Sequence, residues 1–351
     1  MKKIKILPSY SKIDRLFLTF PTMENRISCI DEFLKLIYTI CSTIESLKLT
    51  IICDKGKIDY IKELIFNYNE ENNSLFDLIK KRENIFIDFF ESSVVDIWIR
   101  DYAFIGNGTN NDLNNSLLKS TYYPRYALET CLTDDACGRK ICEKYSPNSF
   151  TTIPFILDGG NVVCNDDFII CTEELFIENY KNFSMKEIQN YFKQNFEQKL
   201  IILPKDPISP ISHSDSILAF LDNKTVLLPS YPNSSEYRID EKYVSEVYKI
   251  LKENLSLDTE YIFIPSDLSD EINDCVFSDA YNYINFLQLD NCIYMPSFID
   301  GKDYEQEIAY IFKKKFPNLN LYFIPCNNIA KGGGGIHCIT NILYHNINED
   351  L

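Results

Sequence analysis

The sequence predicts an α/β protein built from a repeated unit, with the units arranged radially or in a closed ring. Short β-rich runs alternate with amphipathic helical stretches along the 351 residues. An apolar-apolar-Pro motif recurs at 202–204, 263–265 and 323–325, at offsets of 61 and 60 residues. A second pair, Leu-Pro-Ser-Tyr at 228–231 and Met-Pro-Ser-Phe at 295–298, is offset by 67. A period of roughly 60–70 residues divides the chain into about five units.

Chance is the alternative explanation for these echoes, because apolar residues followed by proline are common at strand ends. Three occurrences at nearly equal spacing favour the repeat. No linker-like change of composition interrupts the chain, so we expect one domain over residues 1–351.

The individual elements follow from the hydrophobic pattern. Residues 15–20 and 49–53 are typical of strands, and residues 26–47 between them carry apolar side chains at helical spacing. The polar, Gly- and Asn-rich segment 107–115 predicts a surface loop. Residues 217–221 and 225–229 predict a hairpin. Further helices are expected near 58–67, 134–144, 185–195, 241–253 and 304–316.

The composition argues against several classes of partner. Lys plus Arg is 35 and Asp plus Glu is 51, which gives a net charge of −16. We therefore expect neither nucleic acid nor an anionic membrane as partner, since both require clustered positive charge. The N-terminus lacks a secretory pattern, no run approaches 18 apolar residues, and the 12 Cys include no Cys-x-x-Cys pair. These features predict a cytoplasmic protein with reduced, mostly buried thiols.

Rare residue types concentrate in four short segments. The single Trp is Trp98, in the run Trp-Ile-Arg-Asp at 98–101. Six of the 11 Gly lie at 159–160 and 332–335, and two of the three His are His213 and His337. Against a background rich in Ile, Asn, Lys, Phe and Tyr, this clustering indicates a functional site.

The four-glycine run leads directly into His337 and Cys338. Such a run is costly in backbone entropy and suits a loop that passes close to a ligand or adopts positive φ. A cysteine just beyond it can reach a substrate, although a thiol is a weak nucleophile until positive charge stabilises the thiolate. The alternative is a flexible hairpin followed by a core cysteine.

His213 and Asp215 are two positions apart and would share one face of a strand. Histidine is the natural proton shuttle near neutral pH, and the carboxylate could bind a cation or orient the imidazole. An ordinary helix or strand cap is the alternative for this pair.

The run at 98–101 predicts either a core Trp beside a surface Arg–Asp ion pair or an Asp held at the floor of a pocket. Residues 158–161 are typical of a hairpin turn whose acid could also join the site.

Taken in order, the four segments resemble the agmatine deiminase family, also called bacterial-type peptidylarginine deiminases, in the guanidine-modifying pentein superfamily. The family pattern runs Trp-x-Arg-Asp, Glu/Asp-Gly-Gly-Asn, His-x-Asp and Gly-Gly-Gly-x-His-Cys-x-Thr, and here it spans Trp98 to Thr340. Two departures concern neighbouring residues: Tyr102-Ala103-Phe104 replaces x-Gly-Pro, and Ser212 replaces a Gly. The resemblance implies a pentein α/β propeller of five pseudo-repeated units around a central active-site pocket.

The resemblance also implies the role of each site residue. Cys338 would be the nucleophile and His213 the general acid and base, while Asp101 and Asp215 would bind the guanidinium. Asp158 would help orient His213 and line the site. The other residues expected to contact or shape the substrate site are Trp98, Arg100, Asn161, Gly334 and Gly335. No cofactor and no metal is implied.

A cysteine beside two carboxylates suits the chemistry of a guanidinium, which is planar and permanently charged. Two carboxylates can grip its N–H groups, and its charge favours the thiolate. We therefore expect a hydrolase that deiminates a small cationic guanidino compound, agmatine first, through a covalent thiouronium intermediate. The alternatives are deimination of peptidyl-arginine, amidino transfer to an amine, and a non-catalytic protein that binds a cation. The sequence leaves a homodimer open, since no pattern encodes the oligomeric state.

Overall fold

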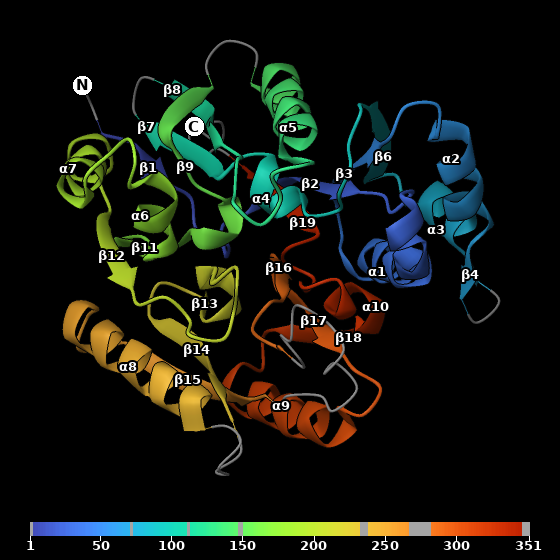
Figure 1. Cartoon of the computed structure of the whole chain (residues 1–351). Coiled ribbons are helices and arrows are strands. Elements are labelled where there is room, and N and C mark those ends of the chain that lie inside the picture. Colours follow the sequence, from blue (N-terminus) through green and yellow to red (C-terminus); the bar gives the residue numbers. More distant parts are fainter. Residues whose placement is uncertain are drawn as a thin grey trace.

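A computed structural model describes residues 3–70, 73–110, 113–146, 150–231, 238–266 and 282–345. The fold is mixed α/β, with strands toward the middle of the molecule and most helices on its periphery (Figure 1). Within the described ranges, no helix combines the length and the apolar character needed to cross a bilayer.

Within the described residues, five sheets of three or four strands share one pairing scheme. In each, an antiparallel pair is followed by a parallel pair, as in β13-β14-β15, where β14 pairs antiparallel with β13 and parallel with β15. The sheets follow one another in chain order around the view in Figure 1. A separate small hairpin joins β4 (Asn69–Glu70) and β5 (Asn73–Ser74).

The strand bounds, sheet by sheet, are as follows. The first sheet holds β1 (Lys5–Ile6), β7 (Gly106–Asn110), β8 (Leu113–Thr121) and β9 (Thr151–Ile156). The next two hold β10 (Val163–Cys164), β11 (Phe168–Thr172), β12 (Lys199–Leu203), β13 (Ala219–Phe220), β14 (Thr225–Ser230) and β15 (Glu260–Pro265). The last two hold β16 (Leu287–Leu289), β17 (Cys292–Ser297), β18 (Asn320–Pro325), β19 (Thr340–Tyr344), β2 (Ile13–Thr19), β3 (Leu47–Cys53) and β6 (Ile85–Glu91).

The repeated sequence motifs lie at equivalent positions in these sheets. The apolar-apolar-Pro motifs end β12, β15 and β18, which are the last strands of three successive sheets. The second pair ends the middle strands β14 and β17. The register is the same in both cases, because Pro229 pairs with Ile264 and Pro296 pairs with Ile324. The periodicity of the sequence therefore reflects a repeated structural position.

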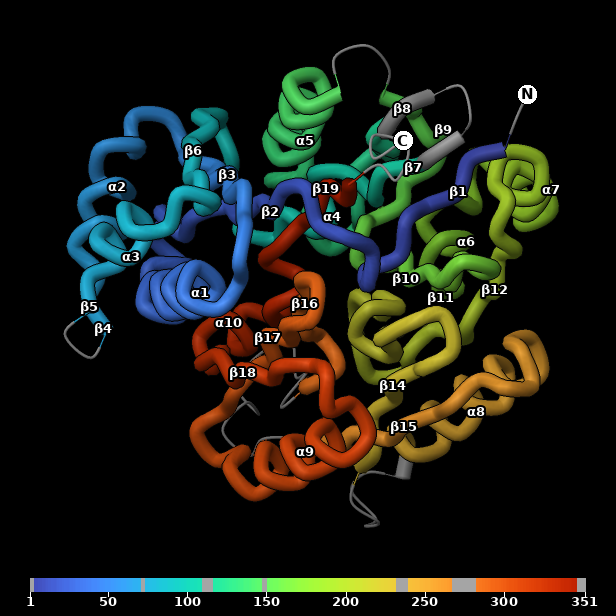
Figure 2. Tube along the Cα trace, turned by 180° about the vertical axis from the view of Figure 1, so that it is seen from behind, coloured from blue at the N-terminus to red at the C-terminus, as the bar shows by residue number. Residues whose placement is uncertain are grey.

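The two ends of the chain share one sheet. β19, near the C-terminus, pairs antiparallel with β2, so that Thr340 faces Leu18 and Ile342 faces Leu16. Figure 2 shows the red β19 beside the blue β2. This pairing fixes the segment that follows Cys338 against the N-terminal strands, and so anchors one side of the site described below.

The helices are amphipathic and pack their apolar stripes against the sheets. In α1 the buried side chains Phe33, Ile37 and Ile40 recur at helical spacing and join the cluster that holds Leu18 and Ile51. The helix bounds are α1 (Ile30–Thr43), α2 (Ile58–Asn67), α3 (Leu75–Lys81), α4 (Ile99–Tyr102), α5 (Cys131–Tyr145), α6 (Glu174–Asn179), α7 (Met185–Asn195), α8 (Arg238–Asn254), α9 (Lys302–Lys315) and α10 (Asn327–Lys331).

Most of the expected elements are confirmed, some with shifted ends. The helix expected over 26–47 is shorter, since residues 24–29 form a 3₁₀ turn, α1 ends at Thr43 and β3 begins at Leu47. The loop expected at 107–115 is wrong, because β7 and β8 occupy most of it. Asn107 is fully buried, and its amide donates to the Tyr344 carbonyl and accepts the Tyr344 N–H, each at 3.0 Å. A polar residue here satisfies the backbone of β19, which composition alone does not reveal.

Candidate active site

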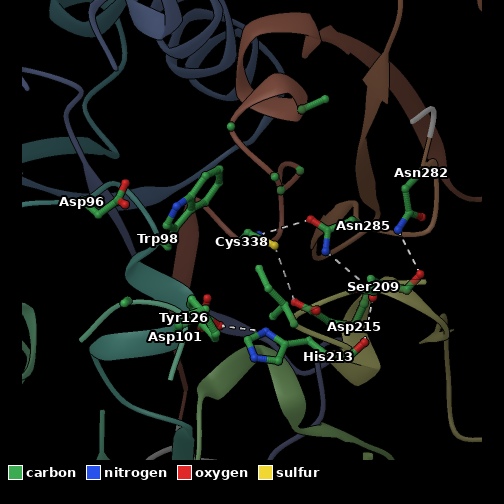
Figure 3. Close-up of a pocket in the computed structure, with 18 of the residues that line it drawn as sticks. Asp96, Trp98, Asp101, Tyr126, Ser209, His213, Asp215, Asn282, Asn285 and Cys338 are labelled. Carbon is green, nitrogen blue, oxygen red and sulfur yellow. Dashed lines mark hydrogen bonds and ion pairs between the residues drawn. The ribbon is translucent and has the colours of Figure 1, made fainter. Parts of the chain in front are cut away.

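Three of the four segments singled out by rare residues line one cavity of about 490 Å³ (Figure 3). The fourth, at 158–161, contacts two of its lining residues, Asp101 and His213. The four segments arrive from α4, from the 3₁₀ turns at 159–161 and 214–216, and from the loop before β19. Segments far apart in the sequence thus supply one site. The lining residues used below are Arg26, Asp96, Trp98, Asp101, Arg125, Tyr126, Glu129, Asp215, His213, Asn285, Gly334, Gly335 and Cys338.

The turn at 159–161 connects two sheets and is not the hairpin that the sequence suggested. β9, before it, pairs with β8, whereas β10, after it, pairs with β11. Its Gly160 N–H donates to Asp101 Oδ1 at 2.9 Å. A Cβ on Gly160 would lie 2.6 Å from that oxygen and 2.8 Å from His213 Nδ1. It would also lie 3.1 Å from Asp215 Oδ2, so three polar side chains converge on one glycine.

His213 lies between two carboxylates. The expected strand is wrong here, since His213 precedes a 3₁₀ turn over Ser214–Ser216 that leads to β13. Its Nδ1 is 3.5 Å from Asp101 Oδ1, and its Nε2 is 3.2 Å from Asp158 Oδ2. The hydroxyl of Tyr126 donates to the same Asp158 oxygen at 2.6 Å. Asp158 therefore contacts the imidazole from outside the cavity lining, so the expectation that Asp158 lines the site is wrong.

Cys338 follows the glycine loop and lies beside Asp215. Its thiol donates to Asp215 Oδ2 at 4.0 Å, as Figure 3 shows. Gly333 has a φ of 95°, a conformation that favours glycine. A Cβ on Gly334 would lie 2.6 Å from the Trp98 ring and 3.1 Å from the Cys338 Cβ. The loop therefore needs glycine in order to pass between the Trp98 indole and Cys338.

Asn285 holds the backbone of Cys338, and sequence reasoning missed it. Its Oδ1 accepts the N–H of Cys338 at 3.2 Å and that of His337 at 3.1 Å. Its Nδ2 donates to the Asp215 carbonyl at 3.4 Å. Tyr126 was missed as well. Asn and Tyr are abundant in this chain, so no rarity marks these positions.

The protonation states follow from burial and from the clustered acids. Burial, with the charges of Asp215 and Asp101, raises the pKa of the Cys338 thiol well above its ordinary value. Burial also raises the pKa of Asp101 to about 7. Burial alone would lower the pKa of His213, but Asp101, Asp158 and Asp215 outweigh it and raise that pKa to about 9. The free site therefore holds a thiol and an imidazolium in one cavity at neutral pH.

Two residues expected to contact substrate lie outside the cavity lining. Arg100 is buried and lines a separate space of about 50 Å³, where its Nε donates to the His337 carbonyl at 3.4 Å. Asn161 accepts the N–H of Thr172 at 2.9 Å and that of Ser214 at 3.3 Å. Their contacts hold the loops of the site together. The surface ion pair considered for Arg100 is also wrong, because the residue is buried.

The two departures from the family pattern have structural explanations. Ser212 adopts a φ of 53°, which explains why glycine is usual at this position. Its Oγ accepts the Asp206 N–H at 2.7 Å, and its N–H donates to Ser209 Oγ at 2.9 Å. The segment at 102–104 is buried in an apolar cluster and is not part of the cavity lining. Neither departure removes a polar group from the site.

A partly buried thiol, a histidine and several carboxylates in one cavity define the site of a cysteine-dependent enzyme with a cationic substrate. The residues that the structure describes contain no group of three or more His, Cys, Asp or Glu arranged to hold a metal.

The fold is similar to that of solved agmatine deiminases. The C. jejuni enzyme matches with a TM-score of 0.75 and 18% identity over 98% of this chain and 97% of that one. A Cys-to-Ser variant of the C. jejuni enzyme with substrate bound matches with a TM-score of 0.76, 17% identity and the same coverage. At these sequence identities, the two structural matches show that the fold is shared and nothing further.

The sequence comparison assigns the chain to a family. The model of the Porphyromonas-type peptidyl-arginine deiminases matches residues 6–343, and the chain belongs to that family. A curated relative, the agmatine deiminase of Ectopseudomonas mendocina, is 27% identical over 235 residues. That alignment spans 59% of this chain and 62% of the relative. The resemblance inferred from the four segments is confirmed at the level of the family.

Proposed function

We propose that this protein is a hydrolase that deiminates agmatine to N-carbamoylputrescine and ammonia. The observation that carries the proposal is the cavity in which Cys338, His213, Asp101 and Asp215 meet. Family membership and the agmatine deiminases among its relatives support the same reaction.

The first step is binding of the guanidinium by the carboxylates of Asp101 and Asp215. Asp215 Oδ1 is buried and has no hydrogen-bond partner in the described part of the chain, so it is available to an N–H donor. The bound cation offsets the two negative charges that raise the pKa of Cys338. The thiol then releases its proton to solvent, and the thiolate faces the guanidinium carbon.

The remaining steps use His213 as acid and then as base. Thiolate attack forms a C–S bond and a tetrahedral adduct. The His213 imidazolium gives its proton to the departing nitrogen, ammonia leaves, and an S-alkyl thiouronium remains. Neutral His213 then removes a proton from water. The resulting hydroxide attacks the same carbon and forms a second tetrahedral adduct. The C–S bond then breaks, the hydroxyl proton of the adduct passes to solvent, and the neutral ureido product and the thiolate are released.

The charges near the rim favour agmatine over free arginine. Two arginines line the cavity, and acids already pair with both. Arg26 contacts Asp96 at 3.0 Å, and Arg125 contacts Glu178 at 2.9 Å and Glu174 at 3.0 Å. A substrate carboxylate would therefore find no unpaired arginine in the described lining. Glu129 adds a further acid, which suits the terminal amine of agmatine.

The test is detection of ammonia and ureido product from agmatine, arginine, methylarginine and an arginyl peptide. We expect agmatine to react fastest, and Cys338→Ala to abolish ammonia release while urea unfolding stays unchanged. Turnover by Cys338→Ala would overturn the mechanism. Faster reaction of the peptide would assign the protein to peptidyl-arginine instead, and the absence of any product would indicate a binding protein.

We further infer that the five equivalent sheets are the units of a closed propeller, which makes residues 1–351 one catalytic domain. The shared pairing scheme and the β19–β2 pairing of the chain ends support this inference. A cytoplasmic location and a homodimer stay predictions from the sequence. Size-exclusion chromatography with light scattering tests the homodimer.

A further inference from the structure

His337, next to the nucleophile, makes a contact that the steps above do not use. Its Nδ1 lies 2.7 Å from Asp215 Oδ2, the oxygen that also faces the Cys338 thiol. Its ring is not part of the active-site lining and lies instead toward the smaller space that Arg100 lines. His337 therefore contacts the site from behind, through one carboxylate oxygen.

The protonation state of His337 makes it a hydrogen-bond donor to Asp215. Burial, together with the positive charge of Arg100, lowers the pKa of the His337 imidazole despite the opposing effect of Asp215. The ring is therefore neutral at pH 7, and only one of its nitrogens carries a proton. Since a carboxylate oxygen accepts, that proton lies on Nδ1.

This hydrogen bond leaves the two oxygens of Asp215 with different roles. Oδ2 accepts from His337 and lies beside the thiol, whereas Oδ1 is buried without a partner in the described residues. A carboxylate is planar, so fixing one oxygen limits where the second can lie. The contact thus sets the direction from which Asp215 can receive an N–H of the substrate.

The backbone links the position of Asp215 to that of the nucleophile. Asn285 Oδ1 accepts both the His337 N–H and the Cys338 N–H. The Arg100 N–H donates to the Cys338 carbonyl at 3.1 Å. One dipeptide therefore carries the thiol and the donor that orients the carboxylate, and any shift of the dipeptide moves both.

We propose that His337 is a positioning residue that orients Asp215 for the guanidinium through its Nδ1–H. This inference rests on the proposed function. The imidazole contacts Asp215 and is not part of the lining that contains Cys338. The hydrogen bond from His337 to Asp215 is charge-assisted. We expect removal of this bond to lower substrate affinity by about 10- to 100-fold.

The test compares His337→Leu, which removes the donor, with His337→Asn, whose amide can place an N–H near the position of Nδ1. With agmatine we expect His337→Leu to raise KM by about 10- to 100-fold and to change kcat less. His337→Asn should stay within about threefold of the parent KM. If His337→Leu does not fold, a rise in KM of more than tenfold for folded His337→Asn overturns the proposal.

Alkylation of Cys338 supplies a second readout that does not depend on turnover. A haloacetamidine is a cation that needs the carboxylates, whereas iodoacetamide is neutral and reports thiol access alone. We expect His337→Leu to slow haloacetamidine labelling by about 10- to 100-fold, with iodoacetamide labelling within threefold of the parent. Equal slowing of both labels would show a merely structural role and refute the proposal. Cys338→Ala controls for labelling elsewhere.

The two readouts separate this proposal from the proposed function. If the parent protein releases no ureido product from agmatine, the reaction assignment fails. The labelling ratio then still reports whether His337 orients Asp215 toward an amidinium. If agmatine reacts but the ratio does not change in His337→Leu, only the role of His337 fails.

Discussion

Gly160 is the position where a single added methyl group would contact three of the polar groups at once. The Cβ of Gly160→Ala would lie 2.6 Å from Asp101 Oδ1, 2.8 Å from His213 Nδ1 and 3.1 Å from Asp215 Oδ2. Relative to an ordinary contact of 3.4 Å, these approaches are about 0.3 to 0.8 Å too short. All three side chains are buried, so none can move freely into solvent.

The expected result is a loss of activity larger than the loss of stability. Displacing reacting groups by as little as about 1 Å can cost on the order of 100-fold in rate, so kcat/KM for agmatine should fall by at least about that factor. Overpacking a buried site costs about 1–3 kcal/mol, which we expect in the free energy of unfolding measured in urea. Ammonia release under steady-state conditions gives the kinetic value.

Gly56→Ala is the matched control for this substitution. Gly56 has a φ of 73°, and no atom lies within 4 Å of its added Cβ. Strain alone should cost about 1–2 kcal/mol there, and kcat/KM should stay within twofold of the parent. If Gly160→Ala keeps kcat/KM within threefold of the parent, the inferred convergence on Gly160 is wrong.

Two further predictions concern the protons and the backbone of the site. Asp101 must be ionised to bind a cation, so kcat/KM should fall as the pH drops below about 7. His213 must be protonated to release ammonia, so kcat/KM should also fall as the pH rises above about 9. Asp158→Asn removes one of the charges that raise the pKa of His213, so the alkaline limb of the pH profile should move to lower pH; an unchanged limb would show that another group controls it. Asn285→Ala leaves the buried Cys338 N–H without the side-chain acceptor, so we expect a loss of about 1–3 kcal/mol in urea unfolding and a fall of about tenfold or more in kcat/KM. An Asn285→Ala variant with parent kinetics would contradict the assigned role of that side chain.

Much of the fold could be predicted because it depends on local patterns. The periods of α2 and α7 matched their observed bounds, and the repeated Pro positions marked equivalent strand ends. Predictions failed where a polar side chain serves a distant partner. Asn107 is polar yet buried, because its amide satisfies a strand that lies 237 residues further along the chain. Local composition cannot report such a pairing.

The roles of individual site residues divide in the same way. Rarity in the sequence located Trp98 and His213, and the cluster of rare glycines pointed to Cys338 directly after it. It did not distinguish the lining residue Asp101 from its neighbour Arg100, which lies in a separate space. Arg100 and Asp101 are adjacent on one short helical turn, so their side chains point in different directions.

The sequence by itself determined the class of fold, the family and the candidate reactive groups, because hydrophobic periodicity and the positions of rare residue types can be read without knowing the tertiary structure. Only the tertiary structure decided which groups meet. It brings Gly160 against Asp101, Asn285 beneath Cys338 and His337 behind Asp215. The physical reason is that protonation and orientation depend on distances between side chains. Those distances are set by the packing of sheets that join segments more than one hundred residues apart.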